Sequence, residues 1–169
     1  MPLRLRPLRE ADEQAVRAAQ QELAPDAFVF ALFYDEAMPW HDYLHLLARQ
    51  RAGAGDLPAP MVPASFLVAD VAGEIVGRVS IRHELNEFLL HEGGHIGFGV
   101  RPAFRRRGYA TEILRQALVV ARAEGVGRVL VTCDQQNIGS AATIERCGGV
   151  LENVVVGHDG AHMRRYWID

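Results

Sequence analysis

The chain has little cysteine: Cys133 and Cys147 are its two cysteines in 169 residues, too few for a disulfide framework. We therefore expect two reduced, buried thiols in a cytoplasmic protein. No apolar run approaches the length of a membrane-spanning helix. The first six residues are followed by neither an apolar core nor a small-residue cleavage site, so no signal peptide is predicted.

An excess of basic charge is also missing. Lysine and arginine total 18 against 21 aspartates and glutamates, which gives a formal net charge of −3. This balance argues against a nucleic-acid-binding protein that relies on a basic surface, and a mildly acidic protein would tolerate and slightly attract a cationic substrate. With 49% hydrophobic and 23% charged residues, the composition is ordinary for a globular protein. We expect one domain over residues 1–169.

Hydrophobic periodicity predicts the order of the secondary-structure elements. Residues 75–82 alternate with period two and predict a half-buried strand, whereas residues 110–121 repeat every three or four positions and predict an amphipathic helix. Strands and helices are mixed without strict alternation, which favours an α+β or α/β sheet over a doubly wound one. The predicted elements are a strand at 3–8, helices at 10–23 and 39–51, strands at 66–71, 75–82 and 95–101, a helix at 110–121, a strand at 128–133, a helix at 140–146, and strands at 150–156 and 163–168.

Residues 96–111 are the most informative stretch and read as a strand, a short loop and the first turn of a helix. Gly108 and Ala110 keep side chains small where the backbone would approach a ligand. The free N–H groups of a first helical turn, preceded here by three arginines at 105–107, favour a phosphate or pyrophosphate. A solvated charge run is the alternative, but a purely structural role at the positive end of a helix favours Asp or Glu.

Residues 105–110 read RRRGYA and resemble the Gln/Arg-x-x-Gly-x-Gly/Ala signature of the GNAT superfamily of N-acetyltransferases. Residues 97–102 are similar to the strand ending in Val-x-Pro that precedes this signature, and residues 137–149 are similar to the family's second motif. The resemblance extends from Leu3 onward and is sharp over residues 96–149. It implies a GNAT-like α/β (α+β) fold, with a mixed, mostly antiparallel central sheet of about seven strands and about four flanking helices.

The resemblance implies an acetyl-CoA-dependent enzyme that moves an acetyl group to a primary amine of a small molecule or peptide, by direct attack in a ternary complex. The pyrophosphate would lie on the loop at 105–110, and the pantetheine arm would run beside residues 98–100 like an added strand. Asn137 would reach the arm from the other side, although either Asn137 or Ser140 alone is more simply a helix cap. The implied cofactor-binding residues are Phe98, Gly99, Val100, Arg105, Arg106, Arg107, Gly108, Tyr109, Ala110, Thr111, Asn137 and Ser140.

The catalytic groups are less well defined. Ile144 stands where the family often has a tyrosine acid, so the thiolate leaves with another donor or unassisted. His95, Glu92 and Asp134 are candidates for acid–base catalysis by their position near strand ends. The missing tyrosine leaves open a non-catalytic acyl-CoA-binding or sensing module. A nucleic-acid-binding protein using residues 105–107 is a third class, which the acidic balance disfavours.

Residues 91–95 read HEGGH, the H-E-x-x-H pattern of zinc proteases. That chemistry needs both histidines on one helical face, and two glycines would each cost the helix about 1 kcal/mol. The following residues read as a strand, so we expect no metal and interpret residues 92–94 as a turn between antiparallel strands. For partners we expect an amine acceptor and allow for a homodimer, with neither nucleic acid nor membrane.

Overall fold

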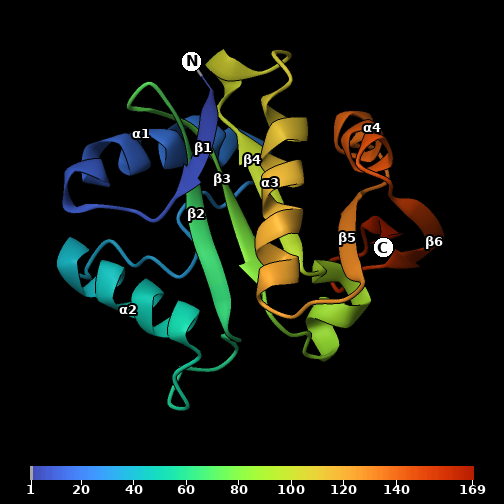
Figure 1. The fold of residues 1–169 in the computed structure, drawn as a ribbon, viewed down its shortest axis with the longest axis horizontal. Helices are drawn as coiled ribbons and strands as arrows, with labels where there is room; N and C mark the ends of the chain where they lie inside the picture. Colours follow the sequence, from blue (N-terminus) through green and yellow to red (C-terminus); the bar gives the residue numbers. More distant parts are fainter. Residues whose placement is uncertain (1) are drawn as a thin grey trace.

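A computed structural model describes residues 2–169 and contains one seven-stranded sheet in the order β1-β2-β3-β4-β5-β7-β6 (Figure 1). Neighbouring strands are antiparallel except for the parallel pair β4–β5. The predicted order of elements and the mixed, mostly antiparallel sheet are confirmed. The strands are β1 (Leu3–Arg6), β2 (Ala64–Val71), β3 (Glu74–Arg82), β4 (Ile96–Val100), β5 (Val129–Asp134), β6 (Val150–Val156) and β7 (His162–Ile168), and the helices are α1 (Glu13–Leu23), α2 (Trp40–Ala52), α3 (Tyr109–Ala123) and α4 (Ile138–Arg146).

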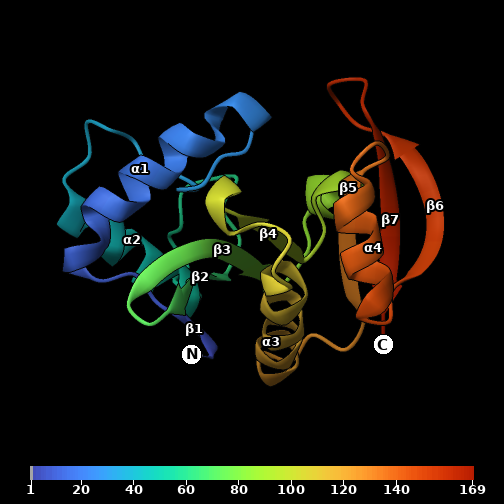
Figure 2. The ribbon, with the colours of Figure 1, turned by 90° about the horizontal axis from the view of Figure 1, so that it is seen from above.

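Helices cover both faces of the sheet, with α1 and α2 on one face and α3 on the other (Figure 2). Each face has its own buried cluster of apolar side chains, and α4 shares the cluster of α3. The predicted periodicity explains how α3 packs, because Ile113, Leu114, Ala117, Leu118 and Ala121 form its buried stripe. None of the helices within residues 2–169 has the length and apolarity needed to cross a bilayer.

The parallel pair β4–β5 is short. The two strands are paired at one position only, where Ile96 lies opposite Val131. One further main-chain hydrogen bond runs from the His95 N–H to the Leu130 carbonyl (2.7 Å). On its other side β4 pairs with β3 along its full length. Within the described chain, residues 97–100 therefore have no strand partner on the side of β5. Such an edge can accept an extended ligand through main-chain hydrogen bonds.

The observed burial of side chains differs from the sequence prediction at two places. The strand at 75–82 is buried on both faces rather than half-buried, since Arg78 and Ser80 are only 3% and 4% exposed. Arg78 is covered because it bonds to main-chain carbonyls of the segment between α1 and α2. Both cysteines are free as expected, but Cys147 is only partly buried, unlike Cys133.

The connection between β3 and β4 is also different from the expected simple turn at 92–94. It contains a π-helical turn, Leu89–Gly93, whose first N–H donates to Asn86 Oδ1 (2.9 Å). Gly94 ends this turn with a φ of 69° and donates to the Leu89 carbonyl (2.6 Å). The strands it joins are antiparallel, as predicted.

Candidate active site

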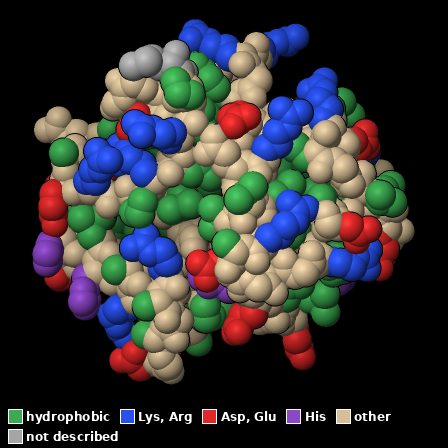
Figure 3. Space-filling model, in the orientation of Figure 1, with side chains coloured by type: hydrophobic (Ala, Val, Ile, Leu, Met, Phe, Trp, Pro, Cys, Tyr) green, Lys and Arg blue, Asp and Glu red, His purple; other side chains and the backbone are tan. Residues whose placement is uncertain are grey.

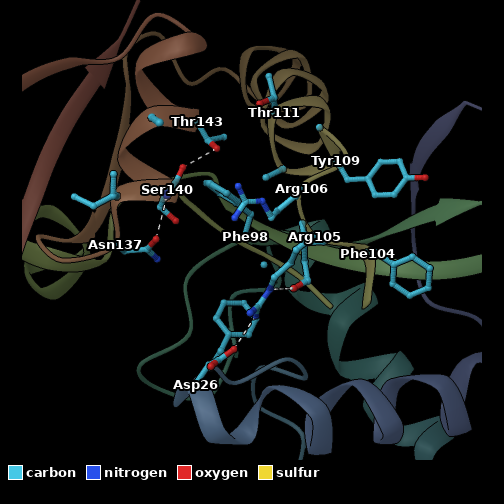
Figure 4. Close-up of a pocket in the computed structure, with 18 of the residues that line it drawn as sticks. Asp26, Phe98, Phe104, Arg105, Arg106, Tyr109, Thr111, Asn137, Ser140 and Thr143 are labelled. Carbon is cyan, nitrogen blue, oxygen red and sulfur yellow. Dashed lines mark hydrogen bonds and ion pairs between the residues drawn. The ribbon is translucent and has the colours of Figure 1, made fainter. Parts of the chain in front are cut away.

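A cavity of about 1020 Å³ lies between the open edge of β4, the start of α3 and the start of α4 (Figure 4). Five segments contribute to its wall: the turn after α1, β4, the loop before α3, the first turn of α3, and one face of α4. Every predicted cofactor-binding residue except Arg107 lines it. The fold thus brings together two sequence motifs that lie about thirty residues apart, as is usual for sites at helix N-termini.

The loop before α3 has the backbone geometry of an anion site. Arg106 and Gly108 both adopt left-handed conformations, with φ values of 62° and 82°. Gly108 is the N-cap of α3, and no side chain in residues 2–169 caps this helix end. The N–H groups of the first turn therefore remain free for a ligand. The strained conformation of Arg106 has no signal in the sequence, since non-glycine residues rarely adopt it.

The three arginines of the loop have separate roles. Arg105 forms an ion pair with Asp26 (2.7 Å) and donates through Nε to the Val100 carbonyl (3.1 Å). Arg107 lies over the Phe104 ring, 5.7 Å from its centre, and does not line the cavity. Arg106 lines the cavity, and the structure of residues 2–169 gives it no ion pair.

The opposite wall is the start of α4 (Figure 4). Asn137 caps this helix by accepting a hydrogen bond from the Ser140 N–H (3.1 Å), as the sequence indicated. This bond uses Oδ1, and Nδ2 has no partner in the part of the chain that the structure describes. Thr143, which sequence analysis did not single out, also lines the cavity and lies three residues after Ser140 on the same helical face.

The three catalytic candidates lie outside the cavity lining. His95 is buried and accepts a hydrogen bond at Nδ1 from the Leu130 N–H (2.9 Å). Glu92 is also buried and accepts from the main-chain N–H of His158 (3.1 Å). Asp134 is exposed and accepts from the Gln136 N–H (2.8 Å) in a local turn. Each has a structural contact, and their catalytic roles stay predictions.

Two further residues define what the site contains. Ile144 is fully buried in the core beside α3, so position 144 supplies no proton donor. Tyr109 lines the cavity, but its hydroxyl points away from it (Figure 4).

The histidines of the HEGGH segment do not converge on a common point. His91 Nε2 bonds the Val156 carbonyl, whereas His95 faces β5. Within residues 2–169, no cluster of three or more His, Cys, Asp or Glu side chains is arranged to hold a metal.

Residues 2–150 match the family model described as the acetyltransferase (GNAT) domain. The chain therefore belongs to the GNAT acetyltransferase family. It is 32% identical over 81 residues to the uncharacterized N-acetyltransferase YjdG of Bacillus subtilis (strain 168), a match covering 47% of this chain and 46% of YjdG. The chain thus spans about half the length of this curated relative.

Solved structures extend the likeness to nearly the whole chain. The acetyltransferase from Agrobacterium tumefaciens str. C58 is 26% identical with a TM-score of 0.65, covering 97% of this chain and 90% of its own. YncA from Salmonella typhimurium, solved with its cofactor acetyl-CoA, is 17% identical with a TM-score of 0.66. The match covers 99% of this chain and 93% of the YncA chain. At that identity the second likeness shows the fold alone.

Proposed function

We propose that the protein transfers an acetyl group from acetyl-CoA to a primary amine. The observation that carries this proposal is the open edge of β4, which leads directly into the uncapped N-terminus of α3 in one cavity. An extended chain of amides ending in a pyrophosphate fits this combination. Membership of the GNAT family supports the same reading.

The cofactor's pyrophosphate would accept hydrogen bonds from the first-turn N–H groups of α3, with Arg106 adding a charge-assisted bond. Its pantetheine amides would bond the free edge of residues 98–100. Asn137 Nδ2 would reach the arm from the opposite wall. Because β5 closes the edge at Ile96, the thioester would lie next to Gly97.

In the reaction, the neutral amine attacks the thioester carbonyl carbon, and the C–S bond then breaks to release the thiolate. The nitrogen loses its extra proton, which passes to the thiolate directly or through water and gives the free thiol. A free alkyl ammonium has a pKa near 10.4, so it must lose its proton before attack. The departing thiolate has a conjugate thiol with a pKa of about 8.5, which makes it a competent leaving group without a tyrosine donor. The cavity wall, with Ile144 buried and the Tyr109 hydroxyl turned away, is consistent with such an unassisted departure.

Titration calorimetry with acetyl-CoA, followed by a free-thiol assay with a panel of amines, tests the proposal. All 18 basic residues are arginine, so no side-chain amine of the enzyme competes as an acceptor. We expect micromolar binding and amine-dependent CoA release. Tight binding without thiol release from any amine would instead support the non-catalytic acyl-CoA-sensing module.

A matched pair of variants locates the pyrophosphate. Gly108→Asn and Gly108→Asp both supply a helix N-cap and both tolerate a left-handed conformation better than other residues. Only the aspartate adds a negative charge, which would repel the pyrophosphate. We expect the Asp variant to bind acetyl-CoA at least about tenfold more weakly than the Asn variant. Equal affinities would place the pyrophosphate elsewhere.

The nucleic-acid alternative gains no support from the surface. On the face shown in Figure 3, arginine side chains are interspersed with acidic ones and do not form a continuous basic patch. Arg105 is paired with Asp26, and Arg107 lies over Phe104, so the stretch at 105–107 does not present three free cations. A phosphate backbone needs an extended basic surface.

A further inference from the structure

Two arginines of β3 lie on the α1–α2 side of the sheet without a carboxylate partner. Arg78 is buried, and Arg82, two residues along the strand, is partly buried. Neither is in ion-pairing distance of an Asp or Glu anywhere in residues 2–169. Arg78 donates instead to the main-chain carbonyls of Val29, Phe30 (3.1 Å) and Gly97 (3.0 Å).

Both guanidiniums approach β4 at the same residue. A Cβ built on Gly97 would stand 3.2 Å from Arg82 Nη1 and 3.8 Å from Arg78 Nη1. The Arg82 guanidinium makes no hydrogen bond within the described chain, whereas that of Arg78 is fixed to the main chain. Arg82 therefore has its donors free beside Gly97, and Arg78 adds positive charge behind it.

His95 adds another donor near Arg82. Its main-chain carbonyl accepts from the Arg82 N–H (2.7 Å), and its ring Nδ1 accepts from the Leu130 N–H. With Nδ1 occupied as an acceptor, the ring proton of neutral His95 is on Nε2. Burial, together with the charge of Arg82, lowers the pKa of His95, which keeps the ring neutral at pH 7.

The charge of these arginines is unfavourable in the isolated protein. Burial lowers the pKa of Arg78 to about 9 and that of Arg82 to about 10, and the neighbouring charge of Arg82 adds to the effect on Arg78. Both remain protonated at pH 7. A partly desolvated cation without a partner destabilises the folded state, and a bound anion would offset that penalty.

The location relative to the reaction follows from the proposed function, on which this inference rests. A pantetheine arm on the open edge of β4 ends where β5 begins to pair, at Ile96. The thioester would then lie beside Gly97, whose built Cβ stands 3.2 Å from Arg82 Nη1. Gly97 and Arg82 lie just beyond the residues that line the cavity, so the acceptor would extend past the lining at Phe98. An acceptor that presents its amine to this thioester would have its nearby substituents against Arg82.

We propose that the acceptor is a small amine that also carries a carboxylate, and that Arg82 binds this carboxylate. The planar guanidinium group of arginine can donate two parallel hydrogen bonds to one carboxylate. Arg78 is a positioning residue, since it ties the segment after α1 to β4 at Gly97. The positive charges of Arg78 and Arg82 would repel polyamines and other acceptors that carry further positive charge.

The test compares each L-amino acid with its own carboxamide in the free-thiol assay, using acetyl-CoA and the unmodified protein. We expect kcat/KM at least tenfold higher for the preferred acid than for its amide. Arg82→Gln should raise KM for the acid about ten- to hundredfold and leave the amide nearly unchanged. Arg82→Lys keeps the positive charge but not the two parallel donors of the guanidinium group, so it should give an intermediate KM.

Two controls separate binding from folding. Arg115→Gln removes an exposed charge from α3 and should change neither KM nor stability. Arg82→Gln should keep the acetyl-CoA affinity and have an unchanged or higher Tm, because it removes an unpaired, partly buried charge. A purely structural arginine would lower Tm when replaced, which would contradict the proposal.

The outcomes distinguish this inference from the proposed function. Equal rates with acids and amides, or an acid KM unaffected by Arg82→Gln, would overturn the carboxylate proposal while acetyl transfer stands. Acetyl-CoA binding without CoA release from any amine would overturn both. The ratio of kcat/KM for the acid to that for its amide is measured on the unmodified protein, so it tests the carboxylate proposal even if a variant does not fold.

Discussion

Arg105 Nη2 lies 2.7 Å from Asp26 Oδ2, so the loop before α3 is tied to the turn that follows α1. Both side chains are about half exposed, and both line the cavity (Figure 4). Arg105 also bonds the Val100 carbonyl, so its guanidinium holds the loop to the end of β4 as well. A carboxylate consequently stands in the wall of a cavity for which we propose a phosphate ligand.

Asp26→Asn should strengthen acetyl-CoA binding by about two- to tenfold, because it removes a negative charge near the pyrophosphate and releases Arg105. The gain should shrink at high salt. Stability should change by less than about 1 kcal/mol, since the ion pair is exposed. Calorimetry at low and high salt measures this, and a weaker affinity would show that the ion pair shapes the loop for binding.

Arg106→Gln and Arg107→Gln form a matched pair of neighbouring, identical substitutions. Arg106 lines the cavity and Arg107 does not, so Arg106→Gln should raise the Kd for acetyl-CoA about tenfold and Arg107→Gln less than about threefold. Calorimetry at one ionic strength compares them. Similar losses of acetyl-CoA affinity in both variants would mean that the arginines act through their long-range positive charge and not through a specific contact.

Asn137 has two separable roles, a helix cap and a proposed cofactor contact. Asn137→Ala should lose the cap to Ser140 N–H, at a cost of about 1 kcal/mol in stability, and should also weaken acetyl-CoA binding. Asn137→Asp keeps the capping oxygen but has no amide donor, so it should keep stability and still lose affinity. Urea unfolding and calorimetry give the two readouts. Unchanged affinity in the Asp variant would leave Asn137 a cap alone.

Asp12 predicts a pH dependence of stability. Burial opposes its ionisation, but the Arg6 guanidinium (2.8 Å) and the Arg9 N–H (2.7 Å) outweigh burial and hold the pKa of Asp12 below its ordinary 3.8. A depressed pKa adds stability that is complete above pH 3.8 and is lost as the pH falls through the folded-state pKa.

Asp12→Asn should therefore cost about 1–3 kcal/mol at pH 7, and the difference from the unmodified protein should shrink below about pH 4. Urea unfolding at neutral and acidic pH measures it. Asp56→Asn, whose ion pair with Arg49 has an 82% exposed carboxylate, is the control and should change little. A pH-independent difference would assign the effect of Asp12→Asn to packing.

The elements and the loop of the candidate site could be predicted because their signals are local. Periodicity identified α3, and Gly108 with Ala110 identified the turn in front of it. Partners distant in sequence could not be predicted: Asp26 is 79 positions from Arg105, and Phe30 is 48 from Arg78. The burial of both faces of β3 depends on such contacts, so alternation alone gave the wrong result.

Net charge does not describe the charge at the proposed acceptor position, for a related reason. A value of −3 averages over the whole surface and favours a cationic substrate. The two arginines beside Gly97 give the proposed acceptor position the opposite sign. Local charge near the reacting atoms decides which substrate is bound, and it depends on which strands lie side by side.

The scarcity of pairing between β4 and β5 has a consequence for how the whole molecule unfolds. Apart from the contacts at His95 and Ile96, the ladder β1–β4 and the ladder β5–β7 share no strand pairing in the described chain. A ligand bonded to both would act as an interstrand bridge, so the two halves should melt more nearly together when it is bound. At a free concentration one hundred times its Kd, such a ligand would stabilise the native state by about 2.7 kcal/mol.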